Sequence, residues 1–214
     1  MGLLEGKVCL VTGAGQGLGR AVALEMASEG AHAVLIDRNA ETLDQVAAEI
    51  AAIGKQASSY SFDVTDYVSY GEAVVDVIAK RGHVDVLVNN AAINPEVRTI
   101  LDDTLEDWRR TIAINLEAVY MGSKLVAPRM VKQGGGRIVH IASIQGYASS
   151  GGCGSYNAAK GGIIALTKSM AVELGPHNIL VNAVAPGFMR TPMSVVNGVD
   201  ETTQQGRHDD DAHA

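Results

Sequence analysis

The 214-residue sequence predicts a single-domain α/β protein, because short apolar runs alternate along it with longer stretches of helical period. The short runs are continuously apolar, which is typical of parallel strands that helices cover on both faces. Hydrophobic residues make up 47% of the chain, enough for one good core, and the length argues against two full domains.

Six runs rich in Val, Ile and Leu are the expected strands. They are Lys7–Thr12, His32–Asp37, Ala57–Asp63, Val84–Asn89, Gly136–Ala142 and Ile179–Ala185. Five helices are expected between them, at Gly17–Ser28, Ala40–Ile53, Asp66–Arg81, Leu105–Gln133 and Tyr156–Leu174. Each helix returns the chain to the same sheet, so we expect parallel strands joined by right-handed crossovers.

Local signals mark several ends of these helices. Gly30 and Gly54 follow expected C-termini, and Asp66 and Thr104 are candidate N-caps. Gly175-Pro176 should end the fifth helix. No fixed-period repeat or Ser/Pro-rich linker precedes residue 194, so we expect one domain over residues 1–192 and a polar, disordered tail over residues 193–214.

Composition excludes several classes of function. The formal charge is −7 and no basic stripe is present, which makes nucleic acid an improbable partner. No apolar stretch reaches the roughly 18 residues needed to span a bilayer, and the start lacks a signal-peptide pattern, so we expect a cytoplasmic protein without membrane association. Cys9 and Cys153 are expected to be free thiols. His208, the aspartates after it and His213 form at best a weak metal site, and we expect no metal.

A glycine-rich turn, Thr12 to Gly19, lies between the first strand and the first helix. Glycines allow the backbone to approach a pyrophosphate closely, and the helix N-terminus favours its charge. The turn matches T-G-x-x-x-G-x-G and departs from G-x-G-x-x-G, because Leu18 occupies the last glycine place. Taken alone, the turn is also compatible with a structural role only.

The second strand ends in Asp37, whose carboxylate can accept bonds from both adenosine ribose hydroxyls and would repel a 2′-phosphate. This favours NAD over NADP, although Arg38 could bind a 2′-phosphate. Asp63 could hold the adenine amino group or cap the next helix. The candidate cofactor-binding residues on this edge are Gly13, Gln16, Gly17, Leu18, Gly19, Asp37, Asp63, Val64, Asn90, Ala91 and Ala92.

Three further residues form a candidate catalytic group. Ser143 ends the fifth strand, and Tyr156 and Lys160 stand four residues apart on one helix face. A phenol with a pKa of about 10 is a poor base at neutral pH, but a nearby cation stabilises the phenolate. Taken alone, Tyr156 and Lys160 are also compatible with an ordinary amphipathic helix; their agreement with Asp37 and the glycine turn favours catalysis.

The order of these motifs, with Asn89-Asn90-Ala91-Ala92, Asn115 and Pro186-Gly187, resembles the classical short-chain dehydrogenases/reductases from Lys7 to about Pro192. The resemblance implies a Rossmann-type doubly wound sheet of strand order 3-2-1-4-5-6 and a homodimer or homotetramer. It also implies roles for individual residues. These are Tyr156 as general acid/base, Ser143 as substrate-positioning group, Lys160 as ribose ligand that lowers the tyrosine pKa, Asn115 as holder of a relay water, and Pro186, Gly187 and Thr191 as nicotinamide-side contacts.

Members of this family normally continue past Thr191 into a substrate lid, another helix and a seventh strand. Only residues 192–214 follow here, so we expect these elements to be missing and the sixth strand to be an unpaired edge. The two long helices, Leu105–Gln133 and Tyr156–Leu174, are expected to support a two-fold interface.

The leading hypothesis is an NAD(H)-dependent oxidoreductase that interconverts a secondary alcohol and a ketone. A dinucleotide-binding regulatory or inactive protein is the second hypothesis, because of the short C-terminus. Sugar-nucleotide epimerase or dehydratase chemistry is the third, and it would normally need a larger substrate domain. The substrate cannot be read from the candidate pocket residues Ile93, Asn94, Ile144, Gln145, Tyr147, Cys153 and Phe188.

Overall fold

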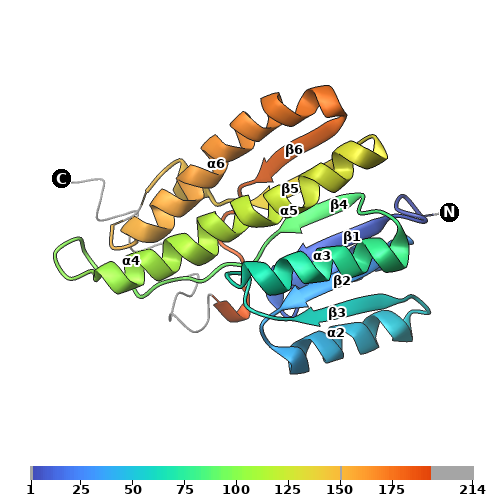
Figure 1. Cartoon of the computed structure of the whole chain (residues 1–214). Coiled ribbons are helices and arrows are strands. Elements are labelled where there is room, and N and C mark those ends of the chain that lie inside the picture. Colours follow the sequence, from blue (N-terminus) through green and yellow to red (C-terminus); the bar gives the residue numbers. More distant parts are fainter. Residues whose placement is uncertain (1, 150, 194–214) are drawn as a thin grey trace.

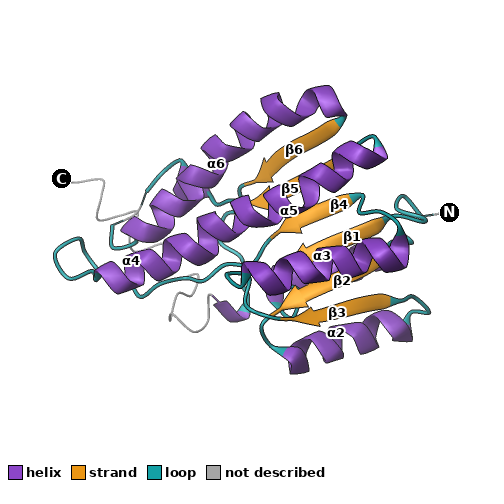
Figure 2. Cartoon of the chain, in the orientation of Figure 1, coloured by secondary structure: helices purple, strands orange, loops and turns teal. Residues whose placement is uncertain are grey.

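The computed structural model describes residues 2–149 and 151–193 and contains one six-stranded parallel sheet (Figures 1 and 2). The strands are β1 (Val8–Thr12), β2 (His32–Asp37), β3 (Ala57–Ser61), β4 (Val86–Asn89), β5 (Gly136–Ile141) and β6 (Ile179–Val184). Their order is β3-β2-β1-β4-β5-β6, which confirms the expected Rossmann-type fold. Among the described residues, β6 pairs only with β5.

Helices cover both faces of this sheet. They are α1 (Gly17–Ser28), α2 (Ala40–Ala52), α3 (Tyr67–Arg81), α4 (Leu105–Ile112), α5 (Ala118–Gln133) and α6 (Gly154–Leu174). Apolar side chains of α1 and α2 pack on one face, and those of α3, α5 and α6 pack on the other. Helices α3, α5 and α6 lie in front of the sheet in Figure 1. The central strands β1, β2 and β4 are therefore buried on both sides, as their continuous apolar character predicts. The outer strands β3 and β6 are only partly buried.

The expected helix Leu105–Gln133 is interrupted. A π-helical segment, Ala113–Glu117, separates α4 from α5, and the amide of Ala118 donates to the carbonyl of Ala113 across it. Such a wide turn inserts one residue into the helical repeat and re-aims the side chains around it. Asn115 lies in this segment and is fully buried.

Most expected helix ends are confirmed. The side chain of Asp66 accepts a hydrogen bond from the amide of Ser69, and Thr104 accepts one from Asp107. Helix α6 ends at Leu174, directly before Gly175-Pro176, as these two residues predict. A short 3₁₀-helix, Gly175–His177, follows it. The start of α6 differs, because it begins at Gly154, two residues before Tyr156.

The expected tail covers residues 193–214, and residues 194–214 lie outside the described residues. The expected domain limit and the expected missing elements therefore remain predictions. Among the helices that the structure describes, none combines the length and the apolar character that a membrane crossing requires.

A titratable side chain lies deep in the core, between the sheet and helices α5 and α6. His140, on β5, is fully buried, and burial lowers the pKa of its imidazole to about 4. The folded protein therefore holds this ring neutral at a pH where the unfolded chain, with a histidine pKa of about 6.5, is already protonated.

The His140 shift predicts a loss of stability in acid. The free energy of unfolding should fall as the pH drops from about 6.5 to about 4, by about 3 kcal/mol from this group, because only the unfolded chain takes up the proton. Urea denaturation at a series of pH values should show this loss in the wild-type chain and not in His140→Leu. Burial also lowers the pKa of His32. Because His32 is present in both proteins, its contribution to the pH dependence cancels in the comparison. Equal pH dependence in the two proteins would contradict the assignment.

Candidate active site

A cleft of about 1110 Å³, including its open mouth, lies at the carboxyl edge of the sheet. Its wall comes from the ends of β1, β2, β4 and β5, the start of α1, the first turns of α6 and the segment after β6. All candidate cofactor-binding residues line it. They are Gly13, Gln16, Gly17, Leu18, Gly19, Asp37, Asp63, Val64, Asn90, Ala91, Ala92, Tyr156, Lys160, Pro186, Gly187 and Thr191.

The glycine turn is packed so closely that side chains cannot replace two of its glycines. Gly13 has a φ of 65°, and a Cβ there would lie 2.9 Å from the Cα of Ala91. A Cβ on Gly19 would overlap the carbonyl oxygen of Gly13. Gln16, the N-cap of α1, makes no side-chain cap bond, so the amides of the first helical turn remain suited to an anion. These features fit a pyrophosphate.

Thr12 holds the turn against the neighbouring strand. Its Oγ1 accepts hydrogen bonds from the amides of Asn90 and Ala91, both at 3.0 Å. The Asn90 amide group donates in return to the carbonyls of Thr12 and Gly13, at 2.9 and 3.2 Å. Asn90 therefore satisfies turn carbonyls as well as lining the cleft. The side-chain role of Thr12 was missed from the sequence, although its place before Gly13 in the turn motif was a signal.

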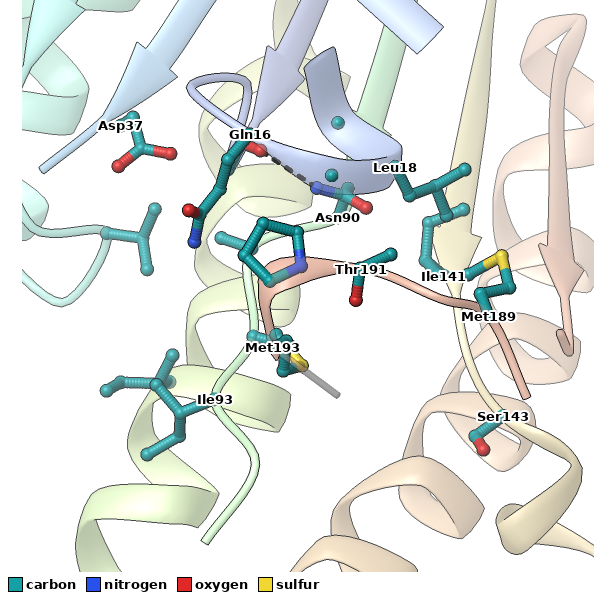
Figure 3. A pocket seen from close by; sticks show the side chains of 18 of the residues that line it. Gln16, Leu18, Asp37, Asn90, Ile93, Ile141, Ser143, Met189, Thr191 and Met193 are labelled. Carbon is teal, nitrogen blue, oxygen red and sulfur yellow. Dashed lines mark hydrogen bonds between the residues drawn. The ribbon is translucent and has the colours of Figure 1, made fainter. Parts of the chain in front are cut away.

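Asp37 lies at the opposite end of the cleft from Ser143 (Figure 3). Its two carboxylate oxygens accept the amides of Gly15 and Asn39, each at 3.1 Å. A carboxylate oxygen can accept more than one hydrogen bond, so both oxygens retain capacity for ribose hydroxyls. Arg38 lines the same end of the cleft.

Asp63 also lines the cleft, but the alternative that it caps the next helix is wrong. Its Oδ1 accepts the amide and the hydroxyl of Thr65, at 2.9 and 2.7 Å. The N-cap of α3 is Asp66, three residues later, so Asp63 stabilises only the turn before it.

Ser143, Tyr156 and Lys160 meet at the other end of the cleft. Ser143 is the N-cap of a 3₁₀ turn, Ile144–Gly146, and its Oγ accepts the amide of Gln145 at 3.2 Å. Ser143 interacts with the Tyr156 hydroxyl closely enough to favour its deprotonated form. Lys160 Nζ lies 5.6 Å from the centre of the Tyr156 ring and donates to the carbonyl of Ile141 at 2.6 Å. The three side chains are thus assembled from two different elements.

Burial dominates the electrostatics of this group. Lys160 is only 3% exposed, and burial lowers its pKa to about 8. Burial also raises the pKa of Tyr156, and the interaction with Ser143 opposes this rise only in part. In the protein chain itself, the expected lowering of the tyrosine pKa by Lys160 is therefore not found. The ammonium group is bonded to the Ile141 carbonyl and is itself destabilised by burial.

Asn115 is brought near this end but does not line the cleft. Both ends of its side-chain amide bind Ile93, the Oδ1 accepting from the backbone amide and the Nδ2 donating to the carbonyl, each at 2.8 Å. The π segment thereby fixes the chain that follows β4. The expected role of Asn115 in holding a water stays a prediction.

The segment after β6 crosses the cleft, with Met189, Thr191 and Met193 between Asp37 and Ser143 (Figure 3). The carbonyl of Pro186 accepts the amide of Ile144 at 3.1 Å and so joins this segment to the Ser143 turn. The apolar lining residues were missed from the sequence, because no motif marks them. They are Phe62, Ile114, Ile141, Ala142, Met189, Pro192 and Met193.

A family model described as short chain dehydrogenase matches residues 7–201 of the chain. The matched range holds the glycine turn, the tyrosine and the lysine described above. The chain therefore belongs to the short-chain dehydrogenase family, and NAD(P)-dependent oxidoreduction is its general activity.

Several relatives resemble the chain over most of its length. It is 42% identical over 191 residues to the 3-oxoacyl-[acyl-carrier-protein] reductase FabG of Thermotoga maritima, covering 89% of this chain and 77% of that protein. Human dehydrogenase/reductase SDR family member 4 is 36% identical, with 94% and 73% covered. The crystal structure of NAD⁺-bound xylitol dehydrogenase aligns with a TM-score of 0.85 at 39% identity, covering 87% of this chain and 72% of that one.

Proposed function

We propose that this protein is an NAD(H)-dependent oxidoreductase that interconverts a secondary alcohol and a ketone. The observation that carries the proposal is the assembly of Ser143, Tyr156 and Lys160 at one end of a cleft whose other end holds Asp37. One end of the cleft thus offers a carboxylate suited to an adenosine ribose, and the other end offers side chains suited to proton transfer.

Asp37 supports NAD as the preferred cofactor. A 2′-phosphate at this position would bring a second negative group against the carboxylate, without a bond from it in return. The NAD⁺ in the related xylitol dehydrogenase structure agrees with this choice. Arg38 in the same part of the cleft is the feature that favours NADP, so the two residues define the test of cofactor choice.

The residues of the chain perform the proton chemistry in this proposal. When bound, a nicotinamide dinucleotide would supply the hydride to the carbonyl carbon in reduction and take it from the alcohol carbon in oxidation. Tyr156 gives its hydroxyl proton to the carbonyl oxygen in reduction and takes the alcohol proton in oxidation. Ser143 donates a hydrogen bond to the same oxygen as its charge changes. Lys160 binds ribose hydroxyls and places a positive charge beside the tyrosine.

The remaining expectations are part of the same proposal. We propose a catalytic domain over residues 1–192, a polar tail over residues 193–214, a cytoplasmic location and a homodimer or homotetramer. In this proposal the protein acts on a small alcohol or ketone, and it binds no nucleic acid, membrane or metal. A dinucleotide-binding protein without turnover is the competing function, and it differs in one observable: it binds NADH and reduces no ketone.

Tyr156→Phe tests the proton-transfer role. This change should reduce kcat by roughly 10²-fold or more, because the ring keeps its packing and loses only the transferable proton. The affinity for NADH should change little. Steady-state NADH oxidation with a panel of ketones, together with fluorescence titration of NADH, checks both points. Tyr120→Phe, on the exposed surface of α5, is the matched control. Turnover that survives in Tyr156→Phe would remove this residue from the mechanism.

Asp37→Ala tests the cofactor preference. Its loss should shift the ratio of NADH to NADPH affinity by roughly tenfold toward NADPH, because hydrogen bonds to a charged group are lost and a repulsion is removed. The ratio is the readout, since loss of the Gly15 and Asn39 contacts can weaken both cofactors. Asp44→Ala, an exposed carboxylate on α2, controls for net charge. An unchanged ratio in Asp37→Ala would overturn the preference for NAD.

A further inference from the structure

The catalytic helix α6 is tied to β5 by two polar contacts from adjacent strand residues. The first is the bond from Lys160 Nζ to the carbonyl of Ile141, at 2.6 Å. The second joins Thr167 Oγ1 to Nδ1 of His140, at 3.0 Å. Thr167 lies seven residues after Lys160, about 10 Å along the helix and on the same face. Two contacts at this spacing fix both the position and the tilt of α6 against the strand.

The His140 contact belongs to a longer buried chain of hydrogen bonds. Asn89, at the end of β4, donates to Ser123 Oγ on α5 at 3.1 Å, and Ser123 Oγ lies 3.2 Å from the other nitrogen of His140. Each member is buried, with His140 and Ser123 fully so. The hydrogen-bond chain therefore runs from the end of β4, beside the cleft residue Asn90, through α5 and β5 to α6.

The hydrogen-bond chain can run in either of two directions, one for each tautomer of the neutral His140 ring. A neutral imidazole donates at one nitrogen and accepts at the other, so one of its two hydroxyl partners must donate to it. Each hydroxyl also has a carbonyl of its own helix within reach, Val119 for Ser123 at 2.8 Å and Ile163 for Thr167 at 2.7 Å. One hydroxyl therefore donates to the carbonyl of its own helix, and the other donates to the His140 ring. Every polar group is satisfied only when both helices keep their places.

We propose that His140 is a positioning residue of the active site: by binding Thr167 it fixes α6 against the end of β5 and so sets where Lys160 and Tyr156 stand. This inference rests on the proposed catalytic role of those two residues. The physical reason is that a buried ring bonded on both sides tolerates little displacement, since moving either helix leaves a buried polar group without a partner. Small displacements of catalytic groups are costly to the rate.

Thr167→Val is the most direct test, because it removes the hydroxyl and nearly preserves the volume. Lys160 is followed by NMR of ¹³C-labelled lysine, with its signal assigned from the Lys160→Arg spectrum. In the wild-type chain Lys160 should titrate at about 8. In Thr167→Val and His140→Leu, water gains access as α6 loosens, and the lysine pKa should rise by roughly 0.5 or more. Thr167→Ser keeps the hydroxyl and should restore the wild-type titration.

Turnover provides the second readout. In Thr167→Val, kcat with the ketone that the wild-type chain reduces fastest should fall by roughly tenfold. The control is Leu43→Ala, a fully buried residue of α2 on the other face of the sheet. It should lower the unfolding midpoint and leave the Lys160 titration unchanged.

Two outcomes separate positioning from a merely structural role. If Thr167→Val and His140→Leu lower the unfolding midpoint as Leu43→Ala does and leave the Lys160 titration at its wild-type value, the proposal is overturned. If His140→Leu does not fold, Thr167→Val against Thr167→Ser decides alone. A shifted lysine titration supports the positioning role even where Tyr156→Phe retains turnover, an outcome that would contradict only the proposed mechanism.

Discussion

Parallel strand pairing is the constraint on which the site depends. All six strands run in one direction, so the residues that follow β1, β2, β4 and β5 meet at the same edge of the sheet. Residues far apart in sequence, from Gly13 to Thr191, thereby line one cleft. The helices that return the chain also contribute, because α1 and α6 begin at this edge and bring a candidate anion site and the candidate catalytic pair, Tyr156 and Lys160, with them.

Burial shifts the pKa values of Lys160 and Tyr156, and it also makes the charged form of Lys160 less stable. Lys160 is a cation in a nearly dry position, held by one carbonyl bond, and its lowered pKa expresses that cost. The same burial raises the pKa of the neighbouring Tyr156. The protein chain therefore holds the Tyr156 phenol protonated, as the proposed donation of a proton to a ketone requires. Positioning contacts deeper in the core, such as Thr167 with His140, keep these two groups from relaxing toward solvent.

Much of this arrangement could be predicted from the sequence, because it follows from local patterns. Continuous apolar runs predicted the parallel strands, and single residues such as Asp66 and Thr104 predicted helix starts. The π segment around Asn115 could not be predicted, since helical periodicity does not report one inserted residue. The His140 contacts were also missed, because Ser123 and Thr167 lie 17 and 27 residues away and only the packed fold joins them.

The central claim is that the cleft binds NADH and that its catalytic end uses it. Fluorescence titration of NADH with the 214-residue chain, followed in the same cuvette by secondary alcohols and ketones, tests this most directly. We expect saturable NADH binding that is tighter than NADPH binding, and oxidation of the bound NADH by at least one ketone. Saturable binding without turnover would favour the dinucleotide-binding protein, and the absence of any binding would contradict the account.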